Sequence, residues 1–183
     1  PDSFVWETPW ENLFLLPSSP VLTQLERELE SRYKIYKLRD ALQKLDAEYD
    51  RVYIDTPPNF NFYSKSALIA ADTVLVPFDC DSFARQSLYS LMDNIAELQE
   101  DHNPDLAVEG IVINQFNSQA RLPGELVAEL EEEGYPVCAT YLSASVKMRE
   151  SHHEHRPLVD LAPSHKLTQQ FLALYDELES GRD

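Results

Sequence analysis

Short apolar runs alternate with helical stretches along most of the chain, and this alternation constrains the fold more than any other feature. Apolar runs at residues 52–55, 73–77, 108–114 and 136–141 are each short enough for a single strand. Between two of them, residues 82–99 carry apolar side chains at the three- and four-residue spacing of an amphipathic helix. Strands that alternate with helices in this way predict a mostly parallel, doubly wound sheet with helices on both faces.

The remaining segments extend this α/β pattern. Residues 13–16 form a short apolar run that predicts a strand, and residues 21–47 indicate two helices that break near residues 31–33. Further helices are predicted over residues 64–71, 122–132 and 166–179. No repeat or linker divides the chain, so we predict a single domain over residues 1–183. Its strands are fewer than a doubly wound sheet normally has, which predicts a sheet that is incomplete at its N-terminal side.

Composition limits the class of protein. The 183 residues suffice for one domain with a sizeable core. No apolar run approaches the roughly 18 residues of a membrane span, and the first residues lack the pattern of a signal peptide. The two cysteines, Cys80 and Cys138, are far apart and show no pairing motif. We therefore expect reduced thiols in a cytoplasmic protein without a membrane span.

Charge and glycine content restrict the possible ligands. The chain has 32 acidic and 15 basic residues, a formal net charge of -17, which opposes non-specific attraction to DNA or anionic lipid. A nucleic-acid role would therefore need a local basic patch. The chain contains 4 glycines, and these are too far apart for a Gly-rich phosphate-binding loop. They are Gly110, Gly124, Gly134 and Gly181.

Asp55 follows the first of the predicted central strands directly. Apolar residues 52–54 precede it, and Thr56 and two prolines stop the strand at once. This predicts a buried strand whose terminal carboxylate lies at the sheet edge where open α/β sheets bind ligands. A carboxylate there can hold Mg²⁺, often through a water, and the hydroxyl of Thr56 could join the same shell. The alternative is that Asp55 merely caps a turn.

Several motifs occur in an order and at spacings that are specific to one family. They are residues 15–19 (LLPSS), 49–58 (YDRVYIDTPP), 66–78 (SALIAADTVLVPF), 103–106 (NPDL), 145–151 (SVKMRES) and 156–158 (RPL). On these motifs the chain resembles the C-terminal portion of ParA/MinD-type P-loop ATPases, the family with a deviant Walker A loop. The resemblance covers nearly the whole chain and implies a P-loop NTPase-like fold with ATP and Mg²⁺ as cofactors.

The resemblance also implies roles for individual residues. Asp55 matches the catalytic, Mg²⁺-binding Walker B aspartate, with Thr56 beside it. Asn114 ends the third predicted strand where related ATPases contact adenine, and its amide offers a donor and an acceptor to a base edge. It could instead satisfy a turn. Ser143 and Met148 fall on the loop that covers the other face of adenine, although the family usually has proline at the position of Ser143.

The resemblance implies a phosphate-binding loop that these residues do not contain. The family's Gly-rich turn, its two lysines and its Mg²⁺-binding threonine would precede Pro1. Without amides and a lysine to neutralise phosphate charge, Asp55 has no triphosphate to organise. We therefore expect that the 183-residue chain alone does not bind ATP appreciably and that both cofactors require the upstream segment.

Partners follow from the same resemblance. It implies a homodimer in the ATP state, a ParB-like partner that stimulates hydrolysis, and non-specific binding to DNA. The DNA-binding candidates are Arg121, Lys147, Arg149 and Arg156. Acidic neighbours surround them, so the alternative is a solvated face with ordinary ion pairs.

Three functions remain open at this stage. The first is an ATP-dependent dimerisation switch that partitions or positions DNA or another cargo. The second is a non-enzymatic adaptor derived from the same fold, and the third is an enzyme of the cobyrinic-acid-synthase type. Two weaker site hypotheses are a metal site among residues 151–155, predicted to be an exposed loop, and a nucleophilic thiol at Cys80.

Overall fold

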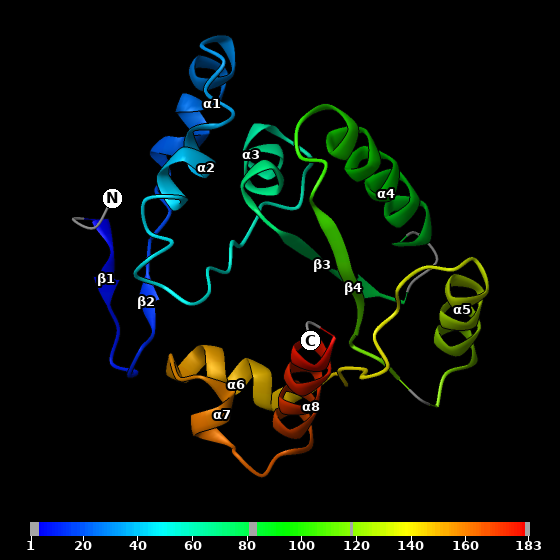
Figure 1. Cartoon of the computed structure of the whole chain (residues 1–183). Coiled ribbons are helices and arrows are strands. Elements are labelled where there is room, and N and C mark those ends of the chain that lie inside the picture. Colours follow the sequence, from blue (N-terminus) through cyan, green and yellow to red (C-terminus); the bar gives the residue numbers. More distant parts are fainter. Residues whose placement is uncertain (1–3, 81–83, 118, 182–183) are drawn as a thin grey trace. The chain divides into compact units, whose positions relative to one another are not determined.

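The computed structural model describes residues 4–80, 84–117 and 119–181 (Figure 1). These residues divide into two compact units, and each is described by itself. The first unit comprises Pro1–Asp72 and Asn94–Leu106, and the second comprises Thr73–Asp93 and Ala107–Asp183.

The first unit contains a short hairpin, three whole helices and residues 94–101 of a fourth. Strand β1 (Trp6–Glu7) pairs antiparallel with β2 (Phe14–Leu15), and β2 confirms the strand predicted there. Helices α1 (Val21–Ser31) and α2 (Lys37–Leu42) confirm two helices with a break between them. Helix α3 (Phe62–Ala70) confirms the next predicted helix and carries most of the unit's buried side chains.

Two asparagine side chains hold the ends of α3. At its start, Asn61 accepts hydrogen bonds from two backbone amides of the first turn. At its end, the Asn103 amide donates to the carbonyl oxygens of Leu68 and Ala71, both at 2.9 Å. Helix ends leave such backbone groups without partners inside the helix, so these contacts explain why α3 begins and ends where it does.

The buried strand predicted at residues 52–55 is wrong for the described structure. The segment has no regular secondary structure, and Val52 is 51% exposed. A strand needs a neighbour that pairs with its backbone amides and carbonyls, and none of the described strands pairs with this run. Without that pairing, the apolar side chains of the segment gain no cover either.

The second unit is built on a parallel strand pair. Strand β3 (Thr73–Asp79) pairs in parallel with β4 (Ala107–Asn114), and α4 (Ala84–Asp101) connects the two along the chain. The register places the last residues of the two strands opposite each other. Helix α5 (Arg121–Glu132) follows β4. These elements confirm the predicted strands and helices to within two residues at most ends.

A third segment runs parallel to β4 on its other edge. Isolated bridges join Ile111 to Val137 and Phe116 to Ser143, so β4 lies between β3 and residues 137–143. The strand predicted over residues 136–141 is therefore reduced to bridges.

The interruption has a local cause in Glu177. The backbone amides of Ala139 and Thr140 donate to its carboxylate at 2.6 and 2.9 Å instead of to a neighbouring strand. Glu177 belongs to α8 (Lys166–Ser180), so this helix holds residues 139 and 140 in place and at the same time interrupts their strand pairing.

Two hydrophobic clusters cover opposite faces of the sheet. Ile111 and Ile113 of β4 belong to the first cluster with side chains of α4 and α5, whereas Val112 belongs to the second with side chains of α7 (Leu158–Leu161) and α8. This alternation follows from the two-residue period of a strand. It confirms a parallel sheet with helices on both faces.

Helix α6 (Val146–Glu154) was not predicted. Its residues lack an apolar stripe at helical spacing. The expectation of a loop over residues 151–155 is wrong, whereas the expected exposure is confirmed for residues 152–155. The helix is held locally instead. Ser145 caps its start by accepting from the amide of Lys147, and His155 ends it in the left-handed conformation at φ 51°.

Candidate functional site

The carboxyl ends of three parallel segments meet at one edge of the second unit's sheet. Asp79 and Asn114 end β3 and β4 opposite each other, and Phe116 bridges to Ser143 of the third segment. Gln115 lies between them at φ 51° and donates from Nε2 to Oδ2 of Asp79 at 2.9 Å. This is the edge at which open α/β sheets bind their ligands.

Asn114 is the amide at this edge that remains available. Its side chain is half-buried and makes no hydrogen bond within the described residues. The turn after β4 is tied to β3 by Gln115 and Asp79, so the alternative that Asn114 serves to satisfy that turn has no support there. Both its donor and its acceptor can therefore face a ligand.

Ser143 is held against α8. Its amide donates to Oε1 of Gln170 at 3.1 Å, and Nε2 of Gln170 donates to its hydroxyl at 3.0 Å. The hydroxyl proton remains available to a ligand. Met148 lies on α6, where it packs against the second hydrophobic cluster.

Aromatic rings beside this edge were missed by sequence reasoning. Phe116 and Tyr141 lie with ring centroids 4.8 Å apart at an interplanar angle of 60°. Phe116 comes two residues after Asn114, and that proximity is the signal that could have identified it.

Asp55 and Thr56 belong to the first unit. Both are exposed, so their oxygen atoms are open to a ligand. Mg²⁺ takes oxygen ligands, keeps several waters and uses one or two carboxylates together with phosphate oxygens. The chemistry of this donor pair fits that pattern. Within the described residues, no group of three or more metal-binding side chains occurs, which leaves the metal hypothesis at residues 151–155 without support.

The four basic candidates differ in their neighbours. Arg121 and Lys147 each form a salt bridge with a glutamate one helical turn along, at 2.6 and 2.5 Å. The hydrogen bond that Lys147 donates to the Glu150 carboxylate raises the pKa of Lys147. Arg149 and Arg156 are exposed, and no carboxylate in the described residues forms a salt bridge with them. Two of the four candidate DNA-binding residues, Arg121 and Lys147, thus have their charge neutralised by a neighbouring glutamate.

Cys138 is a buried thiol beside the interrupted segment. Burial raises its pKa to about 11, with smaller contributions from the carboxylates of Glu177 and Glu109. Cys80 is half-buried and forms no disulfide within the described residues. The thiolate is the reactive form of cysteine, so Cys138 should be inert near neutral pH.

We expect iodoacetamide to modify Cys80 well before Cys138 in the native chain near neutral pH. Because the Cys138 pKa is raised, its labelling rate should increase as the pH approaches about 11. Peptide mass spectrometry of timed samples measures both rates, and the urea-unfolded chain is the control in which they should converge. Equal rates in the native chain would contradict the buried thiol.

A membrane-spanning helix is absent from the part of the chain that the structure describes, since none of its helices is long and apolar enough.

A family model described as an AAA domain matches residues 2–108. The chain belongs to the ParA/MinD-type P-loop ATPase family. The resemblance inferred from its motifs and the P-loop NTPase-like α/β fold are thereby confirmed.

Individual relatives agree with this assignment. The chain is 35% identical over 170 residues to the chromosome partitioning protein ParA of Myxococcus xanthus, covering 91% of this chain and 59% of that protein. Cobyrinic acid a,c-diamide synthase of Mycobacterium smegmatis, solved with ADP and magnesium, is 28% identical with a TM-score of 0.73, covering 79% of this chain and 60% of that one. An ATP complex of McdA from Cyanothece has a TM-score of 0.84 at 21% identity, covering 97% and 70%, and shows the shared fold. The chain thus spans 59% of the length of its ParA relative.

Proposed function

We propose that the protein is a ParA-like ATPase that acts as an ATP-dependent dimerisation switch in partitioning or positioning DNA or another cellular cargo. The observation that carries the proposal is the edge at Asn114, where three parallel segments end beside an amide without a partner in the described residues. Its 35% identity to a chromosome partitioning protein favours this function over the cobyrinic-acid-synthase alternative.

The second unit supplies the adenine contacts in this proposal. The Asn114 amide can donate to one position on the base edge and accept from another, and adenine offers both an acceptor and a donor. Ser143 and Met148 approach the other face of the base. Ser143 is held in place by Gln170, so the contact does not depend on a proline at this position.

The first unit supplies the magnesium contacts. Mg²⁺ bound with ATP neutralises phosphate charge during phosphoryl transfer. Asp55 would hold Mg²⁺, often through a water, and would help to orient the attacking water, and Thr56 would add its hydroxyl to the same shell. Both functions need the phosphate-binding segment that the family carries upstream of the residues present here.

The switch itself is a cycle of association. ATP stabilises a homodimer, a ParB-like partner stimulates hydrolysis, and hydrolysis releases the two subunits. Arg149 and Arg156 are the strongest DNA contacts among the four candidates, because Arg121 and Lys147 are paired with glutamates. The net charge of -17 predicts that this DNA binding is weak, and it should weaken further as salt increases.

Isothermal titration of the 183-residue chain with Mg²⁺ and ATP is expected to show no micromolar binding. The 4 glycines cannot form a phosphate-binding loop, so phosphate charge would be held by too few groups. Micromolar affinity would contradict this expectation.

Recovering the upstream coding sequence separates the ATPase from the adaptor. A Gly-rich loop with its lysine there supports the ATPase, and ATP titration of the longer product should then show binding that Asn114→Ala weakens. A longer product that lacks such a loop, or that binds ATP equally well with Asn114→Ala, would contradict the proposed site.

A further inference from the structure

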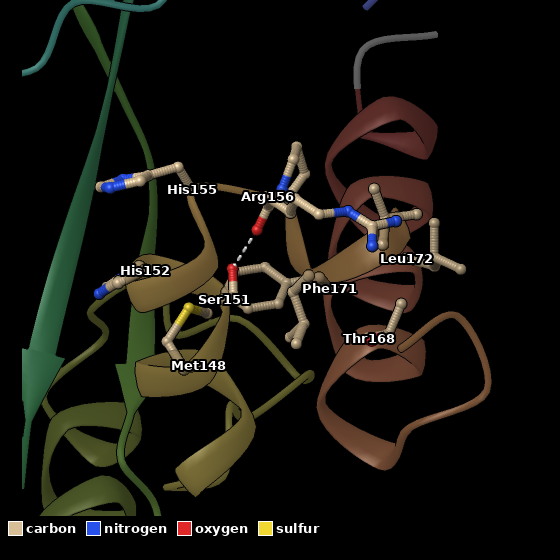
Figure 2. Close-up of a pocket in the computed structure, with 11 residues that line it drawn as sticks. Met148, Ser151, His152, His155, Arg156, Thr168, Phe171 and Leu172 are labelled. Carbon is tan, nitrogen blue, oxygen red and sulfur yellow. Dashed lines mark hydrogen bonds between the residues drawn. The ribbon is translucent and has the colours of Figure 1, made fainter. Parts of the chain in front are cut away.

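A groove separate from the sheet edge lies in the second unit among α6, α7 and α8 (Figure 2). Its cavity measures about 650 Å³, enough for several large side chains. Apolar side chains from all three helices line it. They are Met148, Leu158, Val159, Phe171 and Leu172.

The mouth of the groove leaves large apolar side chains in water. Val159 is 50% exposed, Phe171 40% and Leu172 45%. Single exposed apolar residues are ordinary, but a cluster of them around a cavity marks a surface that a partner covers.

The charges around the groove oppose those of the chain as a whole. The chain has 32 acidic residues, yet none of them lines the groove. Its lining instead contains Arg156, His152 and His155. Figure 2 shows the Arg156 side chain reaching toward α8 near Leu172, while the two histidines extend from α6 in a common direction. An acidic ligand is therefore the complement of this rim.

The polar groups inside the groove are already satisfied. The buried Ser151 hydroxyl donates to the carbonyl oxygen of Arg156 at 2.5 Å, and that of Thr168 donates to the carbonyl oxygen of Ala162 at 2.6 Å. A polar group placed in the depth of the cavity would find few partners and would lose its hydration. The fitting occupant is apolar in the cavity and acidic at the rim.

We propose that this groove docks an acidic peptide segment of a partner protein. An apolar or aromatic side chain of the peptide fills the cavity against Phe171 and Leu172. Its carboxylates accept hydrogen bonds from Arg156 and from the ring N–H groups of the histidines. This is recognition of an amphipathic segment in a groove. It goes beyond nucleotide binding, because Arg156, Phe171 and Leu172, on which the peptide contacts depend, have no part in the proposed nucleotide site. Met148 lines the groove and is also a proposed adenine contact.

Selection from a random peptide library displayed on phage, against the immobilised 183-residue chain, tests the proposal. The enriched peptides are expected to combine a large apolar residue with at least two carboxylates. A fluorescein-labelled copy of the most enriched peptide then gives the affinity by anisotropy. Arg156→Glu and Leu172→Glu should each weaken it about tenfold or more, since one reverses the rim charge and the other charges the apolar wall.

Arg27→Glu is the matched control, because Arg27 is also an exposed arginine but lies on α1 in the first unit. It should leave the affinity unchanged, and thermal unfolding should confirm that all three variants fold. The proposal is overturned by enrichment without carboxylates, by no enrichment, or by equal binding to the groove variants. The proposal is also overturned if the groove binds a second copy of the chain or a lipid surface instead. The groove substitutions would then abolish self-association, measured by light scattering, or binding to anionic phosphatidylglycerol vesicles, and would leave peptide binding intact. Loss of peptide binding in a longer product of the gene would also overturn the proposal, because it would show that another part of the protein's own chain covers the groove.

Discussion

Replacing Ile113 with alanine is expected to lower the free energy of unfolding by about 2–5 kcal/mol. The Ile113 side chain has 0% exposure. It projects from β4, the middle segment of the parallel sheet, into the first hydrophobic cluster, which it shares with side chains of α4 and α5. Truncation removes apolar surface from the core and leaves a cavity that close-packed neighbours fill only in part. Urea unfolding followed by far-UV circular dichroism measures the change.

Val52→Ala is the matched control. Val52 also belongs to a short apolar run that predicts a buried strand, but it is 51% exposed in the structure. Its truncation should change the free energy of unfolding of the 183-residue chain by no more than about 0.5 kcal/mol. Comparable losses for the two substitutions would show that residues 52–55 are buried after all.

Gly110→Ala is expected to lower the free energy of unfolding by about 1–3 kcal/mol through overpacking. A Cβ atom at Gly110 would lie 2.5 Å from Sγ of Cys138, far closer than such atoms normally approach. Gly110 is buried in β4, and Cys138 lies on the segment beside it, so this glycine sets how closely the two backbones approach. Chemical denaturation again provides the measurement.

A double-mutant cycle with Cys138→Ala tests the cause. Removing the sulfur should recover most of the stability lost in Gly110→Ala, because the clash involves that atom. Gly124→Ala is the control, since its Cβ would meet no heavy atom within 4 Å and alanine favours the helix α5. Additive losses at Gly110 and Cys138 would count against the close approach.

Strong periodicity identified most elements correctly. The β4 run and the leucine spacing of α4 and α8 carry their own signals, because a strand repeats every two residues and a helix every 3.6. Helix α6 lacks such a stripe and depends on the cap at Ser145. The strand predicted at residues 52–55 is wrong although its apolar pattern is clear, because no described strand pairs with this segment.

The candidate site divides in the same way. Asn114 could be predicted because it ends a recognisable strand within a family pattern. The contact between Gln115 and Asp79, which ties down the turn and leaves the Asn114 amide available, joins residues 36 positions apart. No local sequence pattern predicts the contact between Gln115 and Asp79.

The sequence by itself determined the α/β class, the parallel pair of β3 and β4, the family, and the identity of Asp55 and Asn114 as candidate ligands. These rest on local periodicity and on motifs that are read along the chain. Only the tertiary structure decided which apolar runs are buried, how Glu177 interrupts the third segment, and where α6, α7 and α8 form an apolar groove with Arg156 in its lining. Burial, strand pairing and charge complementarity depend on residues distant in sequence, and their outcome is set by which groups meet when the chain folds.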